Sequence, residues 1–152
     1  MSDTRALIDT NILVYLHDEN EPLKQRAAGE LIAALHRSGS GAVSTQVLAE
    51  FFVTAMRRFQ RVMNRVDAFA QTRLWADVFT VYDTTADVVA EALRGVERYQ
   101  FPYYDAQIWA VARLNHIPFV LSEDFNGGCT IEGVRFLNPL VEGFDLEAAL
   151  SM

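Results

Sequence analysis

The sequence predicts an α/β fold in which a mostly parallel sheet is covered on both faces by helices. Short apolar segments of strand length alternate along the chain with longer segments whose apolar residues recur at helical spacing. Parallel neighbouring strands need crossover connections, which are usually helices, so this alternation indicates successive β–α units. Ligands in such folds gather at the carboxyl ends of the strands, and candidate site residues are therefore sought there.

The N-terminal half is expected to alternate short strands with longer helices. Pro22 suits the first turn of a helix, and apolar residues recur every four positions from Leu23 until Gly39 ends the helix. The other expected segments are strands at 5–9 and 42–43 and helices over about 45–65 and 66–75.

The C-terminal half continues the same alternation. "DVFTVYD" (77–83) alternates as a strand does, and Thr84 with Asp87 resembles a capping box that starts the next helix. Pro102 opens a further helix. The last expected strands are "IPFVL" (117–121) and a short segment within "GVRFLNP" (133–139).

Composition predicts one globular domain over residues 1–152, located in the cytoplasm. The chain is 51% hydrophobic and 22% charged, so it can build a core, and its apolar runs are shorter than the roughly 18 residues that span a bilayer. Its N-terminus lacks the layout of a signal peptide, and its one cysteine excludes an intrachain disulfide. The net charge of −7 argues against a generally nucleic-acid-binding surface, although a cation-filled acidic site remains compatible with it.

Four carboxylates stand out by their positions. Asp9 and Asp124 follow expected strands and should share one rim of the sheet, Asp105 lies in a first helical turn, and Glu50 interrupts an apolar helical run. Each has a purely structural interpretation: a helix N-terminal acid for Asp105, a turn for Asp124 and an ion pair for Glu50. Asp9 is harder to explain in this way, because it lies between two apolar clusters.

Together the four acids predict a site for divalent cations. Carboxylates brought together would repel one another without cations, and Mg²⁺ or Mn²⁺ suits an all-oxygen set. Zinc is disfavoured because the three histidines lack ligand spacing and Cys129 stands alone. No G-x-S-x-G or Walker motif offers another chemistry. Metal-assisted hydrolysis of phosphodiester bonds needs no side-chain nucleophile and fits these residues.

Four motifs in order, "LIDTNILVY", "STQVLAEFF", "YYDAQIWAVA" and "LSEDFNGG", closely resemble those of PIN-domain ribonucleases. The nearest likeness is to the VapC-like toxins of type II toxin–antitoxin pairs, and it extends from Arg5 to about Pro139. The resemblance implies a three-layer α/β/α sandwich around a mostly parallel sheet. It also implies a Mg²⁺- or Mn²⁺-dependent endoribonuclease with an RNA substrate, often a homodimer, that a small antitoxin silences.

By position, the resemblance assigns catalysis and metal binding to the four acids. Asp9 and Asp105 are expected to be the principal ligands, Asp124 a ligand directly or through water, and Glu50 a ligand or the group that orients water. Glu123 is the alternative fourth acid, but successive side chains at a strand exit turn opposite ways, which favours Asp124. Supporting roles are expected for three polar residues: Asn11 beside the first acid, and Thr10 or Ser44 as hydrogen-bond donors to Asp9.

A basic stripe and an aromatic cluster complete the candidates. Arg57, Arg61 and Arg65 recur every four residues, with Arg58 beside them, and are expected to form one cationic helix face. This face could be merely solvated, or could contact RNA or an acidic antitoxin segment. Aromatic residues flank Asp105 and could stack RNA bases, but packing is favoured for each: Tyr99, Phe101, Tyr103 and Tyr104.

Two other functions fit parts of this pattern. A catalytically silent PIN-like module that binds RNA or protein would be expected to lack one acid of the set, and none is missing. A phospho-acceptor receiver domain also gathers acids at strand ends, but it needs a lysine near the site. The only lysine, Lys24, lies in a predicted surface helix. An active ribonuclease is therefore favoured.

Overall fold

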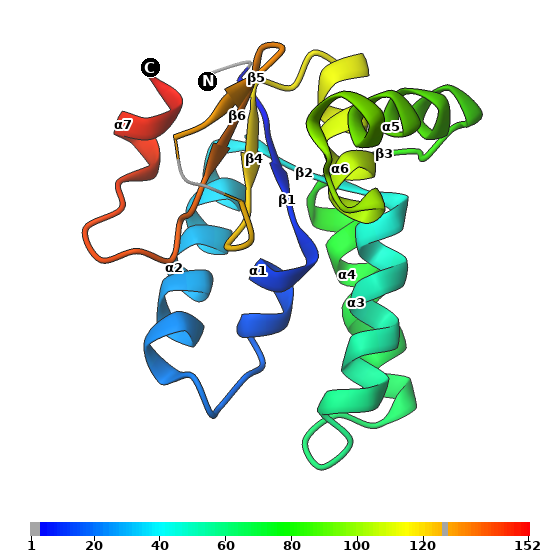
Figure 1. The fold of residues 1–152 in the computed structure, drawn as a ribbon. Helices are drawn as coiled ribbons and strands as arrows, with labels where there is room; N and C mark the ends of the chain where they lie inside the picture. Colours follow the sequence, from blue (N-terminus) through cyan, green and yellow to red (C-terminus); the bar gives the residue numbers. More distant parts are fainter. Residues whose placement is uncertain (1–3, 126–127) are drawn as a thin grey trace.

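The computed structural model describes residues 4–125 and 128–152 (Figure 1). Residues 126 and 127 of the fourth motif, and residues 1–3 of the expected domain, lie outside them. The strands are β1 (Ala6–Ile8), β2 (Gly41–Ser44), β3 (Thr80–Tyr82), β4 (Phe119–Leu121), β5 (Thr130–Ile131) and β6 (Val134–Leu137). The helices are α1 (Thr10–Tyr15), α2 (Pro22–Ser38), α3 (Thr45–Arg58), α4 (Arg65–Val78), α5 (Ala86–Tyr99), α6 (Tyr103–Leu114) and α7 (Leu146–Leu150).

The strands form one sheet in the order β3-β2-β1-β4-β6-β5. All neighbours are parallel except β5 and β6, which pair antiparallel. In the register of the central pair, Ile8 of β1 lies opposite Leu121 of β4. The carboxyl ends of β1 and β4 therefore coincide, and the residues that follow these two strands emerge side by side.

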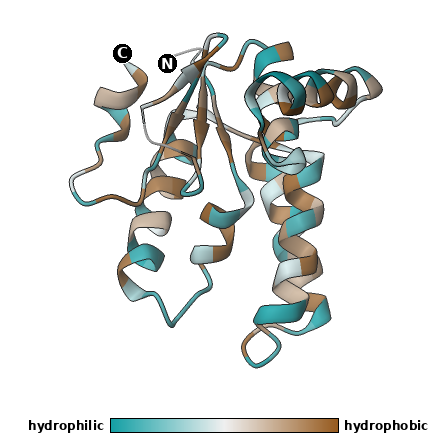
Figure 2. Cartoon of the chain, viewed as in Figure 1, coloured by the Kyte–Doolittle hydropathy of each residue, from teal (hydrophilic) through white to brown (hydrophobic). Residues whose placement is uncertain are grey.

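Helices enclose the sheet and complete the α/β/α sandwich that the sequence predicts. Helix α1 packs against α2 and α3, α3 packs against α4, and α5 packs along α6. Helices α2, α3, α4 and α6 contact strands. Every residue of β1, β2 and β4 is buried, and Figure 2 shows the central strands as predominantly hydrophobic. Strands buried on both faces are typical of a parallel sheet covered by helices.

The helix expected over 45–65 ends seven residues earlier than expected. Helix α3 ends at Arg58, with Phe59 as its C-cap, and α4 begins after Asn64. Asn64 accepts a hydrogen bond from the Asp67 N–H and donates its own N–H to the Asp67 carboxylate, which is a complete capping box. This cap starts a new helix, so the helix expected over 66–75 is confirmed and extends over 65–78.

Two boundaries near β3 were also wrong. The strand expected over 77–83 contains only Thr80–Tyr82, because Asp77 and Val78 complete α4 and the Phe79 N–H still bonds to the Trp75 carbonyl. The cap of α5 is Thr85 rather than Thr84, since the Thr85 hydroxyl accepts from the Val88 N–H.

The remaining expected elements are confirmed, with small shifts at their ends. Helix α2 begins at Pro22 and ends before Gly39, whose φ of 69° provides the left-handed C-cap that glycine favours. The sequence did not predict α1, which starts directly after β1, nor the short elements β5 and α7. Among the described residues, no helix has both the length and the apolar character needed to cross a membrane.

Candidate active site

The four predicted acids meet around one cavity of about 280 Å³ at the carboxyl ends of the central strands. We call it the acidic cavity and define it by Asp9, Glu50, Asp105 and Asp124. These residues come from the end of β1, helix α3, the first turn of α6 and the segment after β4. The fold therefore brings together carboxylates that are up to 115 positions apart in the sequence.

Asp9 occupies the junction between β1 and α1. Its own N–H bonds to the Leu121 carbonyl and so extends the β1–β4 ladder by one position. Its side chain is the N-cap of α1, where Oδ1 accepts from the Thr10 N–H at 2.7 Å. The other oxygen, Oδ2, accepts from the Ser122 hydroxyl at 2.6 Å. Asp9 is 7% exposed, so these contacts fix its direction within a mostly dry environment.

Asp124 lies on the exposed side of the cavity. Its carboxylate accepts from Asn11 Nδ2 at 3.1 Å, and its N–H donates to the Ser122 hydroxyl oxygen at 3.1 Å. The same hydroxyl oxygen also accepts from Asn11 Nδ2 at 3.2 Å. Ser122 and Asn11 thus join Asp9 to Asp124 through hydrogen bonds.

Glu123 lines the same cavity but is neutralised by residues of this chain. Lys24 Nζ lies 2.8 Å from its Oε2, and the Tyr15 hydroxyl donates to its Oε1 at 2.5 Å. Partial burial raises the pKa of Glu123, but the hydrogen bonds from Lys24 and Tyr15 outweigh it and lower the pKa overall. The geometry therefore favours Asp124 over Glu123 as the fourth acid.

Glu50 projects from α3 and is held at both oxygens. The Thr10 hydroxyl donates to Oε2 at 3.0 Å, and Gln46, one helical turn earlier, donates from Nε2 to Oε1 at 2.7 Å. Gln46 is itself held, because Gln107 of α6 donates to its Oε1 at 2.8 Å. A chain of hydrogen bonds from α6 through α3 to α1 thus fixes the Glu50 carboxylate.

Burial and neighbouring carboxylates raise the pKa values of Asp9 and Asp105. The pKa of Asp9 is raised from 3.8 to about 6, mainly by burial and further by the charges of Asp124 and Asp105, against the opposing hydrogen bonds from Ser122 and Thr10. Burial, Asp124 and Glu50 also raise the pKa of Asp105. Among the described residues, none of the four acids forms an ion pair with a basic side chain.

The chemistry of these donors fits a hard divalent cation. In their described positions, residues 4–125 and 128–152 contain no three His, Cys, Asp or Glu side chains grouped closely enough to hold a metal ion. However, Mg²⁺ keeps several waters and needs only one or two carboxylates, so a complete protein cage is unnecessary. Uncompensated carboxylates with raised pKa values are what a cation would relieve.

The supporting residues differ in part from the prediction. Ser44 does not donate to Asp9 but caps α3, where its hydroxyl accepts from the Val47 N–H at 3.1 Å. Thr10 contacts Asp9 through its backbone N–H, and its hydroxyl serves Glu50. The residue that sequence reasoning missed is Ser122. It follows β4 as Asp9 follows β1, so aligning the two strand ends would have placed the two residues side by side.

The basic stripe is not one helix face. Arg57 lies in the last turn of α3, Arg61 lies in the turn after this helix and Arg65 begins α4, because α3 breaks at Phe59. Arg58 lines the acidic cavity but pairs at 2.9 Å with Asp18, which is buried. The expected contact of these arginines with RNA or an antitoxin stays a prediction.

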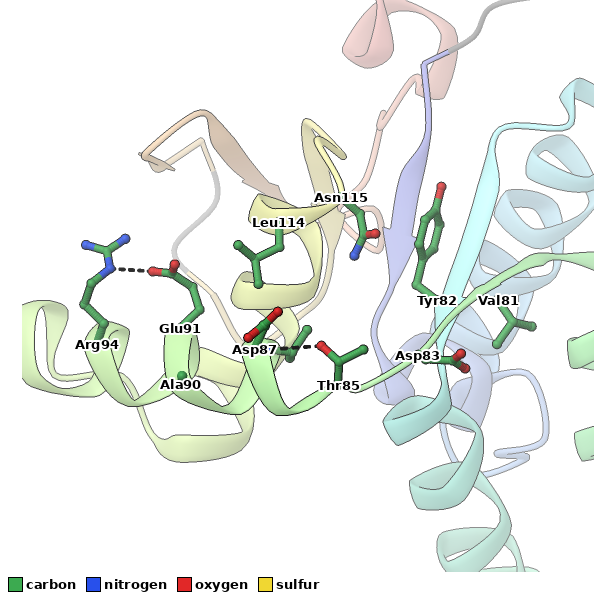
Figure 3. A pocket seen from close by; sticks show the side chains of 11 residues that line it. Val81, Tyr82, Asp83, Thr85, Asp87, Ala90, Glu91, Arg94, Leu114 and Asn115 are labelled. Carbon is green, nitrogen blue, oxygen red and sulfur yellow. Dashed lines mark hydrogen bonds and ion pairs between the residues drawn. The ribbon is translucent and has the colours of Figure 1, made fainter.

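A larger cavity, of about 810 Å³, lies between β3, α5 and the end of α6 (Figure 3). It contains none of the four acids. Its Glu91 is paired with Arg94 and Arg113, and Thr85 is occupied in capping α5. Because this cavity contains none of the four predicted acids and its Glu91 is paired with two arginines, we place the candidate chemistry in the smaller acidic cavity.

The fold and the cavity together define an α/β protein with an acidic site suited to hard cations. The family model of the PIN domain matches residues 6–126, and the chain belongs to this family. That match contains all four acids of the cavity. No functionally curated protein matches the chain significantly.

Solved structures with the same fold include toxins and toxin–antitoxin complexes. A toxin–antitoxin complex from Klebsiella pneumoniae is similar with a TM-score of 0.65 at 23% identity, over 88% of this chain and 97% of that chain. VapC20 from Mycobacterium tuberculosis, a toxin that cleaves the sarcin–ricin loop, is similar with a TM-score of 0.60 at 23% identity. The similarity covers 86% of this chain and 98% of that chain. VapBC2 from Rickettsia felis, bound to a promoter DNA fragment, is similar with a TM-score of 0.63 at 14% identity. The similarity covers 88% of this chain and 97% of that chain.

Proposed function

We propose that this PIN-domain protein is a Mg²⁺- or Mn²⁺-dependent endoribonuclease that acts as the toxin of a type II toxin–antitoxin pair. The observation that carries the proposal is the acidic cavity itself. Four carboxylates from distant segments meet there without a basic partner among the described residues, and the pKa of the most buried one is raised to about 6. Such an arrangement is costly unless a cation compensates it.

The roles proposed for the acids are those that the family resemblance implies for their positions. Asp9 and Asp105 would hold the metal, and Asp124 would do so directly or through water. When bound, the metal supplies positive charge at the scissile phosphate and lowers the pKa of a water molecule. Glu50 is either a further ligand or the group that orients the attacking water. Its two oxygens are fixed by Thr10 and Gln46, so it is preorganised to accept a hydrogen bond from that water.

The biological role rests on the similar structures. One of them is a toxin–antitoxin complex, one is VapBC2 bound to promoter DNA, and one is a toxin that cleaves the sarcin–ricin loop. We therefore propose that a small antitoxin binds and silences this chain, that the protein forms a homodimer, and that it acts on RNA in the cytoplasm. The dimer is tested by light scattering, and the antitoxin by co-expressing any short reading frame adjacent to the gene.

The proposal is tested by inducing the protein briefly in a bacterial host and sequencing RNA 5′ ends. Wild-type protein should arrest growth and create new 5′ ends at defined positions, whereas Asp9→Asn should do neither. Purified wild-type protein should cleave the same RNA with Mg²⁺ or Mn²⁺ and stop when EDTA is added. Cleavage by the Asp9→Asn protein at the wild-type rate, or cleavage that persists in EDTA, would refute the assignment.

A further inference from the structure

A second hollow, which we call the side groove, adjoins the acidic cavity between α3 and the start of α6. It has a volume of about 700 Å³, within the range of pockets that hold small ligands. Gln46, Glu50, Thr54 and Tyr104 line both the acidic cavity and the side groove. A polymer whose phosphate lies at the four acids would therefore have its neighbouring unit at this groove.

Tyr104 is the one member of the aromatic cluster around Asp105 that is left exposed. Phe101 packs against Tyr99, Trp109 and two further rings, and Tyr103 is partly buried against the core. The Tyr99 hydroxyl donates to Glu132 at 2.7 Å. Tyr104, by contrast, is 63% exposed and touches Tyr103 edge-on, with ring centroids 5.2 Å apart. Its ring can therefore receive a flat partner.

The walls of the side groove are fixed by hydrogen bonds. On one side Gln46 is held between Gln107 and Glu50. On the other side the Thr45 hydroxyl donates to the Thr84 hydroxyl at 3.3 Å and accepts from the Thr84 N–H at 3.0 Å. A groove with preset walls loses little entropy when a ligand enters it.

Charge identifies the kind of occupant. Arg57 lines the side groove, is exposed, and forms no ion pair among the described residues. The neighbouring Arg58, by contrast, pairs with Asp18. An uncompensated arginine beside an exposed tyrosine, in a protein of net charge −7, matches a ligand that combines an anion with a flat ring.

We propose that the side groove binds one unpaired base of the RNA substrate, stacked on Tyr104, with an adjacent phosphate at Arg57 and the scissile phosphate in the acidic cavity. The inference rests on the proposed ribonuclease function and adds a recognition element to it. Stacking accepts any base face, so Tyr104 favours single-stranded over paired RNA. Tyr104 would accordingly select unpaired cleavage sites without reading a long sequence.

The test measures binding of fluorescein-labelled hexaadenylate in EDTA, which prevents cleavage, by fluorescence anisotropy. Tyr104→Ala should weaken binding about tenfold, as expected for the loss of one base stack. Tyr104→Phe should bind within twofold of wild type, because stacking does not need the hydroxyl. The matched control is Phe69→Ala, which removes an exposed aromatic ring on α4 outside both hollows and should also bind within twofold of wild type.

Two further measurements separate stacking from charge. A hexamer without bases should bind wild type and Tyr104→Ala equally. Arg57→Gln should reduce the slope of log K against log salt by about 0.7, the value for one phosphate contact with a single strand, and Tyr104→Ala should leave that slope unchanged. Equal binding of hexaadenylate by wild type and Tyr104→Ala would overturn the inference. The inference would also be overturned if Tyr104→Ala weakened binding of the hexamer without bases as much as it weakens binding of hexaadenylate.

Failure of the base-binding inference can be distinguished from failure of the proposed ribonuclease function. If Mg²⁺ elicits no cleavage but the Tyr104 and Arg57 effects are observed, the ribonuclease assignment fails and the base-binding groove stands. If cleavage occurs and Tyr104→Ala leaves both binding and cleavage positions unchanged, the groove assignment fails alone. If Tyr104→Ala weakens binding of the antitoxin but not of RNA, the occupant is a protein segment and the inference is likewise overturned.

Discussion

Two clusters of acids in this protein have opposite electrostatics. Glu91 and Glu132 are paired with Arg94 and Arg113, and the hydrogen bonds from Tyr99 and Arg94 lower the pKa of Glu132. In the acidic cavity, burial and neighbouring carboxylates raise the pKa of Asp9. Both clusters join residues that are distant in the sequence. The chain therefore neutralises one group of acids with its own arginines and leaves the other without a basic partner among the described residues.

The largest expected difference between the clusters is in RNA cleavage. Asp105→Asn should reduce the cleavage rate by roughly 10²–10³-fold, the usual effect of removing one preorganised electrostatic group. Glu132→Gln is the matched control, since it neutralises an acid of the arginine-paired cluster, and it should cleave at the wild-type rate. Initial rates on one labelled RNA with Mg²⁺ present measure both. Equal rates for Asp105→Asn and Glu132→Gln would erase the functional distinction between the clusters.

The second expected effect is on stability and concerns Asp9 without metal. Because its pKa is raised from 3.8 to about 6, the folded state binds the extra proton and stability falls as pH rises from about 4 to 6. Above pH 6 the ionised carboxylate is fully destabilising, so Asp9→Asn should stabilise the protein. The asparagine also loses one hydrogen bond that the carboxylate makes. The net increase in the free energy of unfolding is therefore about 1–2 kcal/mol.

Urea unfolding of both proteins in EDTA at pH 4 and pH 8 measures this effect. The increase in the free energy of unfolding caused by Asp9→Asn should be present at pH 8 and vanish at pH 4. Adding Mg²⁺ should stabilise the wild type but not the variant, because only a site that binds the metal gains from it. An Asp9→Asn protein that is less stable than wild type at pH 8 would show that the carboxylate is compensated within the chain.

A smaller effect is expected from Ser122, which donates to Asp9 and accepts from Asn11 and Asp124. Ser122→Ala should weaken Mn²⁺ binding about tenfold, since groups that orient metal ligands contribute at this level. Ser44→Ala is the control, because Ser44 is also buried at a strand end but caps α3. It should lower stability by about 1 kcal/mol and leave Mn²⁺ affinity unchanged. Calorimetric titration with Mn²⁺ distinguishes the two serines.

The smallest effect is expected in the arginine-paired cluster. Glu132→Gln should lower Tm by less than about 4 °C, because partly exposed ion pairs contribute little and are screened by salt. Thermal unfolding at 50 mM and 500 mM NaCl should show the difference from wild type shrinking with salt. A difference that is larger, or independent of salt, would mean that this cluster is as strongly coupled as the acidic cavity.

The sequence predicted the sheet and most of the helices, because these depend on patterns of local burial. It also predicted the four acids that define the acidic cavity, from their positions at element ends and from the family resemblance. Asp9 was identifiable since a carboxylate between apolar clusters conflicts with burial. The sequence did not reveal the contacts of Ser122 and Gln46, because these depend on strand register and on which face of α3 meets α6. It also misplaced Ser44, whose local role as a cap competes with a role beside Asp9.

The break between α3 and α4 shows the same limit for helix boundaries. Four-residue spacing suggested one basic face over Arg57, Arg61 and Arg65, but periodicity alone does not distinguish one helix from two in succession. The capping box of Asn64 and Asp67 was the local signal that marked the second helix. The expected boundary after Arg65 kept all three arginines on one helix, whereas the structure separates Arg57, which lines the side groove, from Arg61 and Arg65.

The pairing of β1 with β4 has a consequence for the newly synthesised chain. Asp9 is made 113 residues before Ser122 and 115 residues before Asp124. Strand β1 can meet β4 only after the intervening chain has been produced and its long loop has closed. A ribosome that releases an incomplete chain ending before β4 therefore releases no assembled site.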